Sequence, residues 1–249
     1  GAGGGLDTLG IARSRPAATL REAIAVIRSL LAGERTTFDG EVFALSDAGL
    51  DFPPPGPVPI YLAGRGPRIL RLAGEVADGA VIGGFATEPG LTYALDLIAA
   101  GERAAGRQPG TVDRLAWLYT CVSDDVAAAR AAVAPMVVAS LITSRPILGR
   151  LGIVLPDRLA DRLEATGWRY PTLSPAEASE LVPDEILDAF SLHGTPATCR
   201  ERLTQVHALG IDHMAFVPFP AEGDTLDRLT QRIATEVVGT GQTLPAGPP

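Results

Sequence analysis

The sequence predicts an α/β fold made of strand–helix–strand units. From Val58 onward, short apolar runs lead through glycine-containing turns directly into segments with helical spacing, which is the βαβ pattern. The chain has 249 residues, a length at which α/β barrels form a single domain. Hydrophobic residues make up 46% of it, enough for a sizeable core.

The first helix is predicted after Arg15-Pro16, with Gly33 ending it. Its apolar residues recur at helical spacing: Leu20, Ile24, Ile27 and Leu31. Residues 34–57 contain short alternating pieces and end in a proline-rich run. This segment is interpreted as a surface excursion from the same domain.

The repeating unit begins with a strand at 58–63, a glycine turn at 64–67, a helix through Ala73 and a strand at 79–83. Pro59 has no N–H and therefore belongs at the beginning of its strand. A helix over about 89–105 and a buried strand over 115–122 follow.

The second half of the chain has a longer insertion within the same pattern. Asp124 is predicted to cap a helix over about 125–142, with Ala128, Ala132 and Val133 on its inner side. Residues 143–180 interrupt the unit with a helical piece near 156–165 and a loop bearing Trp168, Tyr170 and Pro171. Such an insertion often forms a lid or an oligomer contact.

The last unit contains a helix over about 183–191 and another that Thr195 caps, with Pro196 in its first position. Its apolar face is formed by Cys199, Leu203 and Val206. A strand at 212–217 and a helix at about 224–237 follow, and 239–249 is expected to be a flexible tail. The strands counted are four: 58–63, 79–83, 115–122 and 212–217.

Composition excludes several function classes. The net charge is −8 and no Lys/Arg cluster is present, which argues against nucleic-acid binding. No uninterrupted apolar run approaches the roughly 18 residues of a membrane span, so we expect a soluble, cytoplasmic protein. The sequence contains no Lys, so any anion site uses Arg or backbone N–H groups.

No catalytic or metal-binding set stands out. Cys121 and Cys199 are far apart and have no CxxC or Cys/His ligand spacing, so neither a disulfide framework nor a metal site is predicted. His193 and His213 are interpreted as structural residues, His213 because it begins a strand. The catalytic residues therefore stay unidentified.

The turn from Ala63 to Arg68 is the strongest candidate for a binding site. It follows a strand and begins a helix, where glycines and free N–H groups favour a phosphate. Arg65 adds a bidentate donor. The alternative is an ordinary glycine-containing turn, since the GxxxxGK[ST] and GxGxxG patterns are both absent.

Two further glycine segments are weaker candidates. Gly83-Gly84 follows a strand at the end where barrel enzymes bind ligands, whereas Asp78-Gly79 is interpreted as a structural turn. Gly1 to Asp7 is either the end of another strand that a flat ring approaches or a linker-like terminus.

Several motifs together resemble the luciferase-like monooxygenase superfamily, in particular its branch of F420-dependent oxidoreductases and methylenetetrahydromethanopterin reductase. They occur in the family's order over about residues 1–125 and 181–238: Leu20-Arg21-Glu22-Ala23-Ile24 after Arg15-Pro16, Phe38-Asp39-Gly40-Glu41, Pro59-Ile60-Tyr61-Leu62-Ala63 with Gly66-Pro67, Leu72-Ala73-Gly74-Glu75-Val76-Ala77-Asp78-Gly79, and Gly194-Thr195-Pro196 ahead of Ala208 to His213. The resemblance implies a (β/α)8 TIM barrel that here keeps about four C-terminal strands. Residues 1–238 would form this partial barrel domain, with the insertion at about 143–180.

The resemblance also implies which residues bind the cofactor. Ala63, Gly64, Arg65, Gly66 and Pro67 would receive its phosphate. Gly3, Asp7, Gly83 and Gly84 would lie near its ring.

The leading hypothesis is therefore an oxidoreductase that transfers a hydride between coenzyme F420 (or, alternatively, FMN) and a small organic substrate. The alternative is a non-catalytic half-barrel that serves as a subunit or interaction module. An exposed inner sheet face would need cover, which implies a homo-oligomer or a complementary barrel half.

Overall fold

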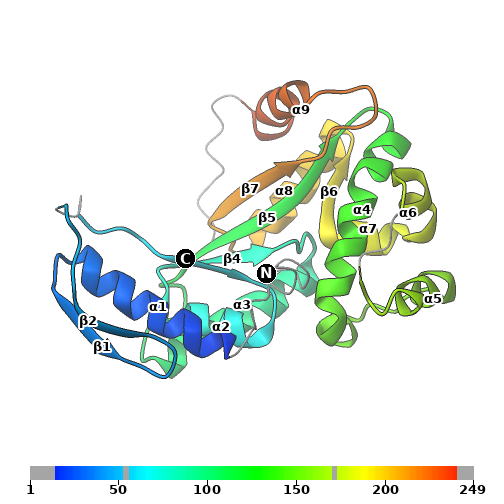
Figure 1. The fold of residues 1–249 in the computed structure, drawn as a ribbon. Coiled ribbons are helices and arrows are strands. Elements are labelled where there is room, and N and C mark those ends of the chain that lie inside the picture. Colours follow the sequence, from blue (N-terminus) through cyan, green and yellow to red (C-terminus); the bar gives the residue numbers. More distant parts are fainter. Residues whose placement is uncertain (1–14, 53–55, 170–172, 240–249) are drawn as a thin grey trace. The chain divides into compact units, whose positions relative to one another are not determined.

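The structure, a computed structural model, describes residues 15–52, 56–169 and 173–239 (Figure 1). The described chain divides into two compact units. The first comprises residues 1–81 and 96–113, and the second comprises residues 82–95 and 114–249. The predicted tail, Tyr170 and Pro171 lie outside the described residues, apart from Gly239.

The first unit contains a helix, a hairpin and the beginning of the sheet. Its elements are α1 (Pro16–Leu31), β1 (Thr36–Asp39), β2 (Ala44–Ala48), β3 (Tyr61–Gly64), α2 (Pro67–Val76), the first residues of β4 (Gly79–Gly83) and the larger part of α3 (Glu88–Ala104). β1 and β2 pair in antiparallel fashion, and β3 and β4 are neighbouring strands. The surface excursion predicted after α1 is thus a two-stranded hairpin.

The buried face of α1 differs in part from the prediction. Ile24 is buried as expected, but Ile27 is 42% exposed and Val26 is buried in its place. Successive residues point about 100° apart around a helix. A small rotation of the helix about its axis therefore changes which residues at the edge of its apolar face are buried.

The second unit contains the rest of the sheet and a group of helices. Its elements are β5 (Asp113–Val122, from Arg114 on), α4 (Val126–Ser144), the 3-10 helix η2 (Arg145–Leu151), α5 (Asp157–Ala165), α6 (Pro175–Leu181), α7 (Asp184–Phe190), β6 (Ser191–Gly194), α8 (Pro196–Ala208), β7 (His213–Pro218), α9 (Leu226–Arg232) and the π-helical turn η3 (Ile233–Val238). β5 pairs in parallel with β6, where Cys121 lies opposite His193, and with β7, where Leu115 lies opposite His213.

Burial alternates along β5, as expected for a strand with one covered face. Ala116 and Leu118 are completely buried, whereas Trp117 between them is 41% exposed. The parallel α/β arrangement is therefore confirmed, although the described residues contain no closed barrel.

Helix α4 is mostly apolar, with Arg130 as its one charged residue. It packs against β6, α6 and α7, which lie beside it in Figure 1. The helical stretch Val126–Leu151 contains an 18-residue window with a mean hydropathy of 1.8 and is long and apolar enough to span a membrane, which the search for uninterrupted apolar runs did not predict. Core helices of soluble proteins have the same composition.

Two local predictions about the second unit are wrong. β6 was not predicted, because four residues between two helices are too few to show a strand periodicity. Among the described residues after 58, the strands therefore number five rather than four. The cap of α4 is Asp125, which accepts the N–H of Ala128. Asp124 instead forms an ion pair with Arg232 at 2.9 Å.

Candidate cofactor-binding site

The turn between β3 and α2 has an open helix N-terminus. Gly66 is the N-cap of α2, and Pro67 occupies the first helical position. The Gly66 carbonyl accepts the N–H groups of Ile69 and Leu70, both at 3.1 Å, but no side chain caps the helix. Helix α8 begins with a similar Thr195-Pro196 pair, and there the Thr195 hydroxyl accepts the N–H of Thr198.

The two glycines of this turn have different surroundings. A Cβ on Gly64 would lie 2.7 Å from Cγ2 of Ile69, so this position is crowded. A Cβ on Gly66 would meet no atom within 4 Å, and the φ of this residue is an ordinary −76°. The space beside the α2 N-terminus is therefore open to a ligand, and helix geometry directs the first N–H groups toward it.

The charge at this turn is positive. Arg65 is half-buried between the two glycines, and Arg68 is exposed in the first turn of α2. No acidic residue lies in that first turn. Guanidinium groups and the positive end of the helix dipole both stabilise a phosphate. The five residues Ala63 to Pro67 thus fit a phosphate group.

The start of β3 is fixed by a hydrogen-bond network around Asp78. Its carboxylate accepts the N–H of Ile60 at 2.8 Å and pairs with Arg28 at 2.8 Å. Gly79 lies against the ring of Tyr61, which leaves no room for a Cβ, and the Tyr61 hydroxyl donates to Asp113. Asp78-Gly79 therefore has structural contacts.

Gly83 ends β4 and Gly84 follows it, both in the second unit. Gly84 has a φ of 70°, a conformation that favours glycine, and its N–H donates to the Trp117 carbonyl at 3.0 Å. The predicted site residues thus form two groups, Ala63 to Pro67 in the first unit and Gly83-Gly84 in the second. Gly3 and Asp7 lie outside the described residues.

A buried polar cluster surrounds His193 on β6, and the sequence did not reveal it. The Ser191 hydroxyl donates to the Leu187 carbonyl at 2.7 Å, so we infer that it accepts a proton from Nδ1 of His193 at 3.1 Å. Asp188 lies 4.0 Å from Nδ1 and pairs with Arg202 at 2.9 Å. Asp188 lies near the end of α7, and Ser191 and His193 lie in β6 directly after it; this closeness along the chain was the sequence signal.

The His193 imidazole is held neutral. Its pKa is lowered to about 4, chiefly by burial; Asp188 opposes this shift, and the nearby Arg202 and Arg130 contribute to it. Burial of the His193 ring and its hydrogen bond with Ser191 account for a structural role of this residue.

The cysteines have equally little reactivity. Burial raises the pKa of the Cys121 and Cys199 thiols to about 11 in each case. In the described parts of the chain, no three His, Cys, Asp or Glu side chains gather as a metal site would require. No catalytic acid or base is identified among these groups.

Comparison with known proteins gives a consistent assignment. The model of the luciferase-like monooxygenase family matches residues 1–213. The 5,10-methylenetetrahydromethanopterin reductase of Methanolobus tindarius is 36% identical over 237 residues, covering 94% of this chain and 69% of the relative. The F420-dependent glucose-6-phosphate dehydrogenase of Beutenbergia cavernae is 38% identical over 157 residues, covering 61% of this chain and 46% of the relative.

A solved structure is similar over nearly the same span. The coenzyme F420-dependent tetrahydromethanopterin reductase of Methanopyrus kandleri superposes with a TM-score of 0.77 at 22% identity, covering 94% of this chain and 70% of that one. At this identity the likeness shows the fold. The chain spans only part of the length of these relatives.

Proposed function

Because the chain belongs to the luciferase-like monooxygenase family, we propose that it is part of an F420-dependent oxidoreductase acting on a small organic substrate. Several relatives are named for coenzyme F420, including the glucose-6-phosphate dehydrogenase and the tetrahydromethanopterin reductase structure. FMN is the alternative cofactor.

The open N-terminus of α2 is the observation that carries this proposal. The backbone N–H groups that follow Gly66 and the guanidinium of Arg65 would hold the cofactor phosphate. When bound, the deazaflavin would supply hydride chemistry. The protein's contribution at this turn is to position the cofactor.

Replacement of Gly66 by Ala tests the site, because the free protein has room for the methyl group. In a titration of F420 followed by absorbance, we expect Gly66→Ala to weaken binding with no loss of folding stability. Arg65→Gln should weaken binding by roughly ten- to a hundred-fold, the range for loss of a charge-assisted hydrogen bond. FMN is titrated in parallel to decide between the cofactors.

Gly149→Ala is the matched control, since a Cβ at Gly149 also meets nothing within 4 Å and the residue lies outside the turn. Its F420 affinity should equal that of the unsubstituted protein. Binding of neither cofactor, or equal affinity in the Gly66→Ala and Gly149→Ala variants, would refute the assignment.

The exposed sheet face in the second unit supports a second proposal, that a complementary barrel part or another copy covers it. Trp117 is 41% exposed on β5, and Tyr119 on the same face is half-buried against Phe219, with 5.9 Å between the ring centroids. Apolar area of this kind is stabilised by burial. Light scattering tests it: a stable monomer of 25.9 kDa would contradict this proposal.

A further inference from the structure

A pocket of about 300 Å³ lies in the second unit and is formed by three separate segments. They are the beginning of α3 with the residues before it, the end of η2 with the residues after it, and α7. This volume is at the lower end of the range for small-molecule sites and corresponds to about ten water molecules.

The closed end of the pocket is aromatic and tightly fixed. The rings of Phe85 and Phe190 are 5.9 Å apart and fully buried. A Cβ on Gly90 would lie 2.7 Å from Cγ of Phe85, so the absence of a side chain there lets the ring pack. The N–H of Ala86 donates to the Ala189 carbonyl at 2.9 Å, which joins the first segment to α7. These contacts pre-form the pocket.

The rim has a different character. Val154 is 85% exposed, an unusual position for an apolar side chain. Glu185, exposed on α7, is the one charged residue among those that line the pocket. In the described ranges Glu185 has no hydrogen bond or ion pair, whereas the adjacent Asp184 pairs with Arg130.

From this distribution we propose that the pocket binds a small amphiphilic cation, with its apolar group against the accessible lining residues Pro89, Ile153 and Ala189 and its charged end beside Glu185. Pro89 is exposed and Ile153 and Ala189 are half-buried, so these side chains offer apolar surface that a ligand would remove from water. The Glu185 carboxylate attracts a cation and repels an anion. The proposal rests on residues of the second unit and uses none of those assigned to the cofactor, Ala63 to Pro67 and Gly83-Gly84.

Three probes of matched shape test the charge preference: 4-phenylbutylamine, 4-phenylbutanol and 4-phenylbutyrate. Binding is followed by NMR shifts of backbone amides in the 249-residue chain, where the Gly90 and Gly152 signals report on the pocket. We expect the amine to bind about two- to five-fold tighter than the alcohol, as for an exposed ion pair, and the carboxylate to bind weakest. The preference should decrease as salt increases.

Glu185→Gln should remove the preference for the amine and leave the affinity for the alcohol unchanged. Glu180→Gln is its matched control, because Glu180 is exposed on α6 and does not line the pocket. Ala189→Phe should abolish binding of all three probes by filling the pocket. Val154→Trp should also obstruct the pocket, and because Val154 is exposed at the rim, the larger side chain should not affect folding. Val126→Trp, at another exposed position, is its control.

The proposal is overturned if the probes shift amides elsewhere, if both obstructing variants bind normally, or if Glu185→Gln keeps the order of affinities. F420 affinity is measured on the same variants. We expect it to stay unchanged, so loss of probe binding and failure of F420 binding are separate results.

Discussion

Gly74 of α2 and Gly101 of α3 lie against each other, and each leaves room for the backbone of the other helix. A Cβ on either glycine would lie 3.0 Å from the Cα of the other. It would also collide with a carbonyl oxygen, that of Ile98 for Gly74 and that of Arg71 for Gly101. We predict that Gly74→Ala or Gly101→Ala lowers the free energy of unfolding by about 3 kcal/mol or more, because backbone cannot move aside as a side chain can.

Chemical denaturation measures this effect, with Gly149→Ala as control. A Cβ at Gly149 meets nothing within 4 Å, so this change should stay within about 1 kcal/mol of the unsubstituted protein. Equal stabilities of the three variants would show that the two helices are not in close contact.

The Tyr93 hydroxyl is buried and has no hydrogen-bond partner among the described residues. Its ring packs edge-on against Phe85, with 6.1 Å between centroids. Tyr93→Phe keeps that ring contact and removes the unsatisfied hydroxyl, so we predict that it raises the free energy of unfolding by about 1 kcal/mol.

Tyr61→Phe should have the opposite sign in the same denaturation measurement. The Tyr61 hydroxyl donates to Asp113, and this bond would be lost. Destabilisation by Tyr93→Phe would instead mean that its hydroxyl has found a partner, such as an ordered water.

The buried imidazole of His193 makes stability depend on pH. Its pKa is about 4 in the folded protein against 6.5 for an ordinary histidine, so between these values the unfolded chain binds more protons. Its contribution to stability is present above pH 6.5 and is lost as pH falls toward 4. We predict that the difference in unfolding free energy between the unsubstituted protein and His193→Gln becomes smaller as the pH falls from 6.5 toward 4. Parallel profiles from pH 7 to 4 would contradict the shift.

Both cysteine thiols should resist modification in the folded protein. Burial raises the pKa of Cys121 and Cys199 to about 11, so almost no thiolate forms at pH 8. We predict no reaction with Ellman's reagent in native buffer and reaction of both thiols in guanidinium chloride. Rapid labelling of the native chain would show that one of them is accessible.

Local signals were enough to predict elements bounded by turn residues. The strand at Gly79–Gly83 has the predicted bounds, and α2 begins at Pro67 after the glycine turn. The same turn was also the strongest candidate site in the sequence, because a phosphate-binding turn is formed by consecutive residues.

Features that depend on distant residues could not be predicted in this way. His193 bonds to Ser191 and lies 4.0 Å from Asp188, both nearby in the chain, but the Arg202 that pairs with Asp188 comes from the following helix. The pocket above Phe85 joins three segments separated by dozens of residues. Neither produces a periodic or local pattern in the chain.

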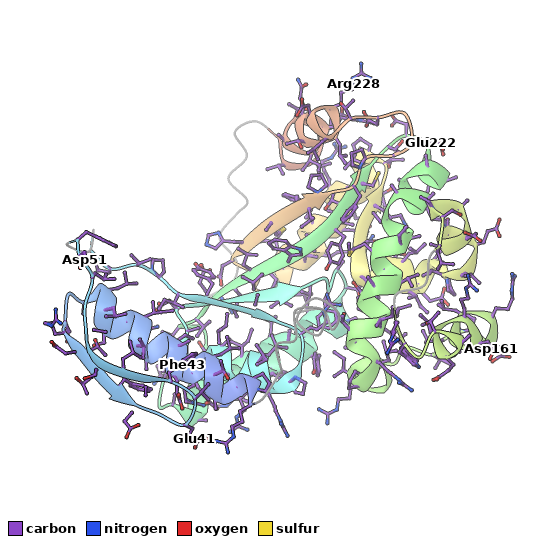
Figure 2. The ribbon with its side chains drawn as sticks, in the orientation of Figure 1. Glu41, Phe43, Asp51, Asp161, Glu222 and Arg228 are labelled. Carbon is purple, nitrogen blue, oxygen red and sulfur yellow. The ribbon has the colours of Figure 1, made fainter. Side chains whose placement is uncertain are left out.

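Glu22 on α1 accepts the backbone N–H groups of Glu41 at 2.7 Å and of Val42 and Phe43 at 2.9 Å. Glu41 and Phe43, labelled in Figure 2, lie in the connection between β1 and β2. A two-stranded hairpin is only marginally stable by itself. The hairpin and α1 should therefore form one foldon: amide protons of the connection would exchange with solvent only as fast as the first turns of α1 open.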